Sequence, residues 1–278
     1  MPQTIEIKPE LSKITIYPVK SLDGVSLQKA QVGNGGCLLH DREYAIVDAD
    51  GDFVNGKSNA RVHSLRSGID IENGMISFRD EEETTWNTFH LQKEIAGINE
   101  YLSDFFKMPV SLVQNSAGRF MDIPDVAGIT ILSSASLEAV SGWFSSMDME
   151  ETRKRFRATI EISGVPAFWE DKLFLEEETA VEFRIGDLTI YGISPRARCV
   201  VPTRHPQTGE VIHGFPKSFA KERAANLPAW STLNEYGHFY YLTVNCYIPE
   251  TETGKWISIG DEIKITGKKH SNPFRNIP

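Results

Sequence analysis

Hydrophobic and polar positions alternate over short runs in the first hundred residues, which is the period of half-buried strands. In "LSKITIYPVKSL" the alternation at 14–16 predicts a strand that ends before Pro18. "EYAIVDADGDFVN" predicts a hairpin with an Asp- and Gly-rich turn, and "GIDIENGMISFRD" predicts another around the Asn-Gly pair at 73–74. The spacing over 94–107 is helical instead, so we expect a helix that stops before Pro109.

The second half of the chain is read in the same way. "ITILSSASLEAVSGWF" predicts a strand leading into a helix capped by Ser133 or Ser134. "RFRATIEISG" and "EFRIGDLTIYGIS" predict alternating strands, and "WISIGDEIKITG" repeats the strand, Gly-Asp turn, strand pattern of a hairpin. Residues 205–238 predict a long loop with a short helix at 218–225. The fold expected is mainly β, or α+β, with two or three helices.

Composition narrows the class of protein. The chain has 278 residues, a formal net charge of -9 and a pI near 5.4, which argues against a nucleic-acid coat or a general affinity for anionic membranes. Three cysteines without CxxC spacing favour a reducing compartment. The N-terminus lacks signal-peptide order and no apolar run approaches a membrane span, so a cytoplasmic protein is expected. The seven histidines show no metal-binding spacing, and nucleotide-binding and hydrolase signatures are missing from the sequence.

One cysteine lies in a basic segment, "SPRARCVVPT". Cys199 follows Arg196 and Arg198 and precedes an apolar pair that ends at a proline. Guanidinium charges favour the thiolate, which is the form of cysteine that attacks electrophiles and ligates metals. A small buried hydrophobe beside two surface arginines fits the same letters, so the local sequence leaves both interpretations open. Cys37 and Cys246 have no adjacent cations and are expected to be core thiols.

Three other basic segments are candidate anion sites. "YPVKSL" places Lys20 and Ser21 at a strand exit, where they suit a phosphate or carboxylate or simply form a solvated turn. In "LLHDREYAIVD", Arg42 follows Asp41 and is either an anion clamp held by a carboxylate or a local surface ion pair. "RKRFRAT" concentrates four cations, of which one inward-facing arginine would suit phosphate, while a charged strand edge explains the others.

The order of these segments resembles the MOSC family. "ITIYPVKSLDGVSLQKAQVGNGGCLLHDREYAIVDADGDFV" resembles its N-terminal β-barrel region, chiefly in the YPVKS turn and the Asp-Arg before an apolar strand. "RFRATIEISGVPAFWEDK" and "FRIGDLTIYGISPRARCVVPTRHPQTGE" resemble the MOSC domain itself, through the Phe-Arg, Ile-Gly-Asp and Arg-Cys elements and the PQTGE turn. The resemblance spans residues 11–266. It implies a MOSC N-terminal β-barrel domain at 1–115 and a MOSC β-barrel domain with a few helices at 116–278.

The resemblance also implies a cofactor and a reaction. Family members with this two-part layout, such as the mitochondrial amidoxime-reducing components, bind a molybdenum–molybdopterin cofactor and reduce N-hydroxylated compounds. Carried over residue by residue, Cys199 becomes the metal ligand and the catalytic position. The cofactor-binding positions implied are Lys20, Ser21, Arg42, Ser133, Ser134, Arg157 and Arg198.

Two departures from the family pattern affect these expectations. The Asn that usually follows Phe-Arg-x is Thr159 here, which puts one hydrogen bond in doubt. No four-cysteine ferredoxin module precedes the end at Pro278, so electrons are expected from a separate flavin reductase or an iron–sulfur or haem protein. The partners expected are this electron carrier and a small N-oxygenated substrate, with no nucleic acid and no membrane.

A sulfur-transfer protein is the alternative from a different class. Cys199 would then carry a persulfide supplied by a pyridoxal-phosphate-dependent desulfurase, which is how the family is associated with pyridoxal phosphate. Arginines stabilise a persulfide anion as they do a thiolate. A cofactor-binding chaperone without turnover is a third hypothesis.

Overall fold

A large sheet organises most of the molecule. The computed structural model describes residues 8–116, 119–122, 128–176 and 179–269. Eight strands form the sheet in the order β15-β11-β12-β13-β9-β10-β1-β2. Each pairs antiparallel with its neighbours except β9 and β10, which run parallel. The strands are β1 (Glu10–Ile16), β2 (Val25–Leu27), β9 (Thr130–Ser133), β10 (Ile160–Ser163), β11 (Ala180–Ile185), β12 (Leu188–Ala197), β13 (Tyr241–Tyr247) and β15 (Ile263–Lys269).

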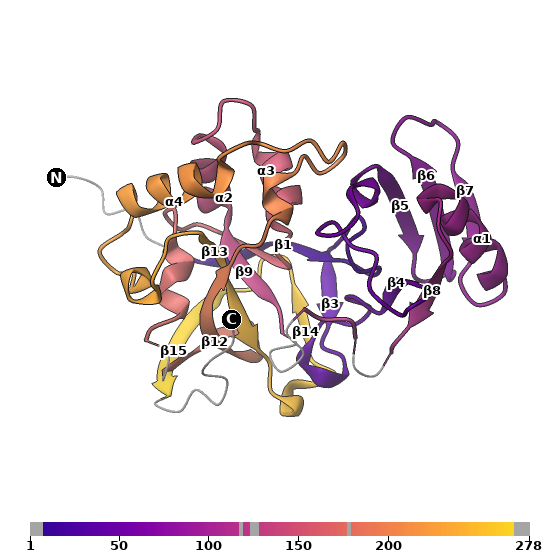
Figure 1. The fold of residues 1–278 in the computed structure, drawn as a ribbon. Coiled ribbons are helices and arrows are strands. Elements are labelled where there is room, and N and C mark those ends of the chain that lie inside the picture. Colours follow the sequence, from indigo (N-terminus) through magenta and orange to yellow (C-terminus); the bar gives the residue numbers. More distant parts are fainter. Residues whose placement is uncertain (1–7, 117–118, 123–127, 177–178, 270–278) are drawn as a thin grey trace.

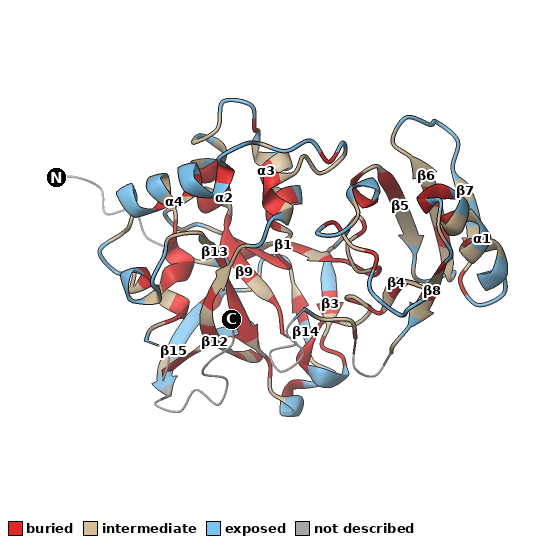
Figure 2. Cartoon of the chain, viewed as in Figure 1, coloured by how far each residue is buried: buried red, intermediate tan, exposed pale blue. Residues whose placement is uncertain are grey.

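The middle of this sheet is buried. The sequence of β13, "YLTVNCY", buries five consecutive positions, and Figure 2 shows β13 and β9 largely in the buried colour. Its neighbours contribute branched side chains to the same core, among them Ile131, Ile160 and Ile190. The predicted strands at 14–16 and in "EFRIGDLTIYGIS" are confirmed as β1 and the β11–β12 hairpin.

A second core lies in the first half of the chain. It packs around α1 (Ile95–Phe106) and two small sheets, which Figure 1 shows on the right. The sheets comprise β4 (Tyr44–Asp48) with β8 (Val110–Gln114), and β5 (Leu65–Asp70), β6 (Met75–Asp80) and β7 (Asn87–His90). The predicted hairpin at 73–74 is confirmed as β5–β6, and the predicted helix is confirmed as α1.

The two halves of the chain exchange strands. β1 pairs with β10 in the large sheet, and β3 (Lys29–Gln31) pairs with β14 (Trp256–Ser258). Figure 1 shows β3 and β14 between the left and right parts of the molecule. The domain boundary expected at 115–116 stays a prediction, and the strands on its two sides are interleaved.

Three helices cover one side of the large sheet (Figure 1). They are α2 (Ser134–Ser141), α3 (Met149–Phe156) and α4 (Phe215–Ala225). Phe156, Phe215 and Phe219 pack together beneath them. The Ser133 side chain accepts a hydrogen bond from the Ser136 backbone N–H at 3.1 Å, so Ser133, and not Ser134, is the N-cap of α2.

Three predictions of local structure need correction. The cations of "RKRFRAT" lie at the end of α3 and at its C-cap, not on a strand, because Asp148 caps this helix and its charges run from acidic to basic. β14 and β15 do not pair with each other as a hairpin, since β3 and β11 take them as partners. The hairpin expected at 44–54 is reduced to one bridge, Val47 to Phe53, because β8 forms the main ladder with β4.

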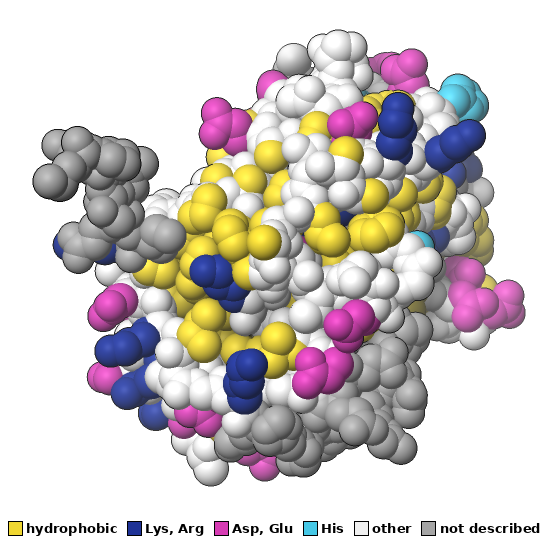
Figure 3. Space-filling model, turned by 90° about the vertical axis from the view of Figure 1, so that its left-hand side faces the viewer, with side chains coloured by type: hydrophobic (Ala, Val, Ile, Leu, Met, Phe, Trp, Pro, Cys, Tyr) yellow, Lys and Arg dark blue, Asp and Glu magenta, His cyan; other side chains and the backbone are white. Residues whose placement is uncertain are grey.

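Surface charge is mixed on the face turned to the left in Figure 1. Figure 3 shows acidic and basic side chains interspersed there around a broad band of apolar ones. Among the described helices, none is both long and apolar enough to cross a membrane.

Candidate functional site

A cleft of about 640 Å³ gathers most of the expected site residues. Residues from both halves of the chain line it, including Lys20, Ser21, Arg42, Arg157, Arg198 and Cys199. Ser133 and Ser134 are not among the lining residues: Ser133 is fully buried against Ser136, and the Ser134 hydroxyl faces that of Ser12 at 3.5 Å. Residues that are far apart in sequence therefore line one cleft, and the Ser133–Ser134 pair lies outside its lining.

The Lys20–Ser21 turn forms part of the wall contributed by the first half. The Lys20 backbone N–H donates to the Tyr44 carbonyl at 2.8 Å, and Ser21 has a left-handed backbone with φ of 73°. The Lys20 ammonium donates to the Phe120 carbonyl at 2.8 Å and to Asp122 at 2.5 Å. Burial lowers the pKa of Lys20, while Asp122 acts to raise it. This ammonium is held in place before any ligand arrives.

Arg42 is anchored in a similar way. Its backbone N–H donates to the Tyr17 carbonyl at 2.8 Å, and its guanidinium donates to Asp41. Asp41 is 1% exposed and also accepts a hydrogen bond from the Tyr17 backbone N–H at 2.7 Å. Burial acts to lower the pKa of Arg42, but neighbouring charges, Asp41 foremost, outweigh it and raise the pKa overall. The Arg42–Asp41 pair is therefore a buried, preformed ion pair and not a local pair on the surface.

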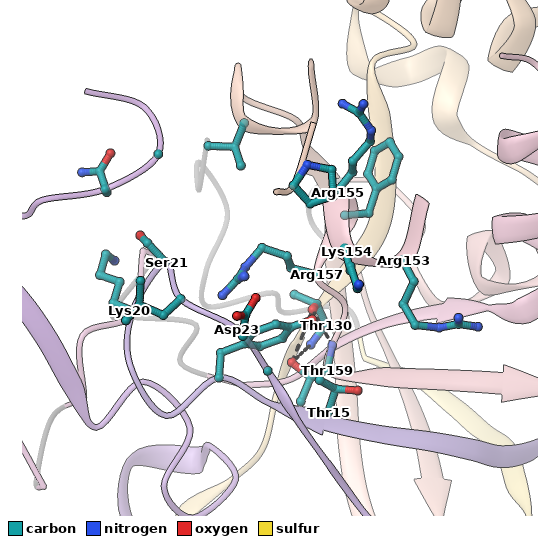
Figure 4. Close-up of a pocket in the computed structure, with 18 of the residues that line it drawn as sticks. Thr15, Lys20, Ser21, Asp23, Thr130, Arg153, Lys154, Arg155, Arg157 and Thr159 are labelled. Atoms are coloured by element: carbon teal, nitrogen blue, oxygen red, sulfur yellow. Dashed lines mark hydrogen bonds between the residues drawn. The ribbon is translucent and has the colours of Figure 1, made fainter. Parts of the chain in front are cut away.

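Arg157 enters the cleft from the end of α3. It is the C-cap of that helix in a left-handed backbone with φ of 52°, and its N–H donates to the Arg153 carbonyl at 2.9 Å. Figure 4 shows its guanidinium extending toward Lys20 and Ser21, whereas Arg153 points the other way. Arg153 is paired with Glu161. Of the cations in this segment, Arg157 is thus one whose side chain faces the opposite wall of the cleft.

The guanidinium of Arg157 lacks an acidic partner. It lies 4.0 Å from the centre of the Tyr17 ring, and no carboxylate of the described residues is within ion-pair distance of it. Burial lowers the pKa of Arg157, and Arg42 acts in the same direction. A desolvated guanidinium with spare donors gains more from an incoming oxyanion than an exposed one does.

The Arg-Cys segment follows β12 directly. Arg196, near the end of β12, and Arg198, just after it, both line the cleft, and Arg196 donates to Asn245 at 2.9 Å. Arg198 donates to the Phe156 carbonyl at 3.0 Å, and its Nε is buried without a hydrogen-bond partner in the described part of the chain. Burial and the charge of Arg196 lower the pKa of Arg198 to about 10. Arg196 and Arg198 are thus two largely desolvated cations that line the cleft.

Cys199 differs from the other two thiols. Cys199 is exposed at the cleft, whereas Cys37 and Cys246 are buried. Burial raises the pKa of both the Cys37 and the Cys246 thiols. The buried-hydrophobe interpretation of Cys199 is therefore wrong, and the expectation that the other two are core thiols is confirmed.

A metal bound at Cys199 would need ligands from elsewhere. Within the described ranges no group of three or more His, Cys, Asp or Glu side chains is arranged to hold a metal ion. A single soft thiolate suits a metal that arrives already coordinated by a cofactor. The cationic walls, the free donors of Arg157 and Arg198 and the size of the cleft fit an anionic organic cofactor of that kind.

Several lining residues escaped the sequence interpretation. Asn245 is 3% exposed in β13, and its amide in an otherwise apolar strand was a usable signal. Asp122 bridges Lys20 and Arg196, across a distance that no local pattern encodes. Thr159, which the sequence did single out, also lines the cleft, and its backbone N–H donates a hydrogen bond to the Thr130 hydroxyl at 3.2 Å.

Comparison with known families decides the relationship. The model of the MOSC N-terminal beta barrel domain matches residues 8–121, and that of the MOSC domain matches residues 123–264. This chain belongs to the MOSC family. The fold expected for that family, mostly β with two such domains, is confirmed.

Curated relatives of this MOSC protein are distant. Mitochondrial amidoxime reducing component 2 of Bos taurus is 24% identical over 248 residues, which cover 74% of this chain and 69% of that one. The human protein of the same name is 25% identical over 246 residues, covering 74% and 70%. Molybdenum cofactor sulfurase of Oryza sativa subsp. japonica is 21% identical over an alignment of 304 positions, gaps included, which covers 91% of this chain but only 35% of the length of the sulfurase.

One solved structure also matches along most of the chain. The YUAD protein from Bacillus subtilis aligns with 92% of this chain and 94% of its own, at 11% sequence identity and a TM-score of 0.37. That similarity is too low to support a conclusion.

Proposed function

We propose that this protein binds a molybdenum–molybdopterin cofactor in the cleft and reduces N-hydroxylated compounds. The observation that carries the proposal is the meeting of an exposed thiol, Cys199, with unpaired cleft arginines in a space large enough for a pterin. Relatives named as amidoxime reducing components support the choice of substrate class. The cofactor, when bound, supplies two-electron redox chemistry.

The residues of the chain bind and orient in this proposal. Cys199 would be the protein ligand to the metal, because thiolate is the soft ligand such a centre takes. Lys20, Ser21 and Arg42 would hold the pterin phosphate from one wall, and Arg157 and Arg198 from the other. Ser133 and Ser134 would act only indirectly, since they do not line the cleft.

The partners follow from the same proposal. A small N-oxygenated compound would be the substrate, and a separate flavin, iron–sulfur or haem protein would deliver electrons. The exposed position of Cys199 would leave the metal accessible to both.

Metal analysis tests the proposal directly. Protein from a host that makes the cofactor is expected to contain close to one molybdenum per chain, and Cys199→Ala is expected to lose most of it. Cys37→Ala removes a buried thiol instead and is expected to keep the metal. Reduction of an aryl amidoxime by dithionite-reduced methyl viologen would be lost with the metal. Equal molybdenum in the wild type and Cys199→Ala would overturn the assignment.

Sulfur transfer is the second candidate. The exposure of Cys199 and the match to molybdenum cofactor sulfurases over most of this chain favour it. A persulfide on Cys199 would then be the functional species. Intact mass after incubation with a pyridoxal-phosphate-dependent desulfurase is expected to rise by one sulfur in this case, and not in Cys199→Ala.

A further inference from the structure

Another arginine of the second half, Arg204, also lines the cleft. Arg204 follows Cys199 after the one-turn 3-10 helix at Val201–Thr203. The turn is fixed, because the Thr203 hydroxyl donates to the Val200 carbonyl at 2.6 Å and the Arg204 N–H donates to the Val201 carbonyl at 3.0 Å. Arg204 is therefore held at a set position relative to the thiol.

The guanidinium of Arg204 is poorly satisfied. The hydrogen bond found for it runs to the Gly209 carbonyl at 3.5 Å, which is the outer limit of such a bond. Its Nε is buried without a partner, and no carboxylate in the described ranges lies within ion-pair distance. Leaving buried donors unpaired is costly, so a purely structural role explains this arginine badly.

Acids that line the cleft or lie beside the neighbouring His205 are already paired with other arginines. Asp23 and Glu81 pair with Arg66 at 2.9 and 3.0 Å. Glu151 pairs with Arg155 at 2.5 Å. These carboxylates therefore pair with arginines other than Arg204.

His63 reports the positive potential beside it. Burial lowers the pKa of His63, and the charges of Arg204, Arg157 and Arg66 lower it further. The His63 ring Nε2 lies 3.4 Å from the Gly56 carbonyl, and the residue lines the cleft with Arg204. An anion placed here would meet two guanidiniums that lack carboxylate partners, those of Arg204 and Arg157.

The PQTGE turn keeps this corner closed. Gly209 has φ of 74°, and a Cβ there would lie 3.3 Å from the Ala60 carbonyl oxygen of the first half. Arg66 donates to the Pro206 carbonyl at 3.3 Å from the same side. The turn thus docks on the first half and forms a wall, so a group bound at Arg204 is confined between both halves of the chain.

We propose that Arg204 and His63 form a second oxyanion subsite in the cleft, apart from the wall of Lys20 and Arg42, with Arg157 shared between this subsite and the phosphate site proposed above. Its ligand would be a carboxylate or phosphate carried either by the N-oxygenated substrate or by a nucleotide attached to the pterin. This inference rests on the proposed function only for the identity of the ligand; the subsite itself is a property of the chain.

The substrate arm measures binding, not turnover. The dissociation constants of a neutral aryl amidoxime and of its carboxylated counterpart are compared on cofactor-loaded, oxidised protein. The wild type is expected to bind the carboxylated compound about tenfold more tightly than the neutral one. Arg204→Gln should remove this preference without weakening the neutral compound, and Arg204→Lys should retain part of it. Arg184→Gln, an exposed arginine on β11, is the matched control and should change neither constant.

The cofactor arm measures nucleotide content. Mild acid hydrolysis of purified wild type would release about one nucleotide per molybdenum if the second oxyanion belongs to the cofactor, and Arg204→Gln would release much less. A thermal melt checks that each variant is folded, with Arg204→Lys as the second variant should Arg204→Gln fail.

The outcomes separate the two proposals. Loss of the carboxylate preference or of the nucleotide in Arg204→Gln supports the subsite and names its ligand. An unchanged preference together with unchanged nucleotide content overturns it. Protein that never binds molybdenum overturns the proposed function, and the binding comparison is then made on the cofactor-free protein, where it still decides the subsite because it needs no turnover.

Discussion

The two walls of the cleft use their cations differently. On the wall from the first half, Lys20 is paired with Asp122 and Arg42 with the buried Asp41. On the wall from the second half, Arg196 pairs with Asp122, but Arg157 and Arg198 have no carboxylate partner among the described residues, and Arg198 leaves a buried donor unpaired. A cation that is paired with a carboxylate is fixed in position and adds to the rigidity of the wall. A buried cation without such a partner instead gains free energy when an anion binds to it. The first wall is therefore preformed and rigid, whereas the second wall has cations whose ion pairs a bound ligand would complete.

The largest expected effect is on the stability of the rigid wall. Asp41→Asn leaves Arg42 buried without its counter-charge, and this should lower the free energy of unfolding by about 3 kcal/mol. Chemical denaturation measures the loss. Asp104→Asn, an exposed change on α1, should leave stability within about 0.5 kcal/mol of wild type. A loss in Asp41→Asn no larger than in this control would mean that the pair does not anchor the wall.

The next effect separates stability from affinity. Arg157→Gln removes an unpaired, desolvated charge, so the cofactor-free protein should melt no lower than wild type, while its dissociation constant for inorganic phosphate rises about tenfold. Arg42→Gln should instead lower the melting temperature, because Asp41 loses its partner. Calorimetric titration and thermal melts give both quantities. Equal changes of the melting temperature and of the phosphate dissociation constant in the two variants would contradict the proposed difference between the walls.

A smaller effect concerns alkaline pH. The pKa of Arg198 is lowered to about 10, so the folded state binds fewer protons than the unfolded chain between pH 10 and the ordinary arginine pKa, and this group favours folding as pH rises there. Phosphate binding needs the charged form and should weaken, by at most about tenfold, between pH 9 and pH 11. In Arg198→Gln the remaining pH slope should be shallower. An equal slope would assign the effect to other groups, such as Lys20.

The smallest expected effect is the loss of stability on changing Asp122, the half-exposed acid that bridges Lys20 and Arg196. Burial acts to raise the pKa of Asp122, but Lys20 and Arg196 outweigh it and hold that pKa well below its usual range. Its contribution to stability is therefore present above the ordinary aspartate pKa and is lost as the pH falls into the acid range. Because the side chain is 45% exposed, Asp122→Asn should cost less than about 1 kcal/mol at pH 7. A cost of several kcal/mol would place Asp122 with the rigid wall.

Local patterns in the sequence predict local structure well. The Asn-Gly turn between β5 and β6 and the periodicity of α1 depend on neighbouring residues alone, and both are confirmed. The helix α3 also had local signals, namely the Asp148 cap and the Glu-to-Arg charge order, but the alternation of "RFRATIEISG" drew attention to a strand. Pairings such as β3 with β14 had no local signal, because the partners lie at opposite ends of the chain.

The residues of the candidate site also divide into those with a local signal in the sequence and those without one. Lys20, Arg42 and Cys199 sit in segments that are unusual in themselves, and the structure brings them to one cleft. Asp122 and Asn245 matter only through what the fold places beside them. The roles of the predicted residues toward a cofactor stay predictions until metal content is measured.

The exchange of strands between the halves has a consequence for biosynthesis. β1 leaves the ribosome long before β10, one of its two partners, has been translated, and more than 220 residues separate β3 from β14. β1 can pair early with β2, but its other edge and β3 must remain open until these later strands have been made. Two polypeptides split near residue 115 should each be poorly soluble alone and recover when produced together.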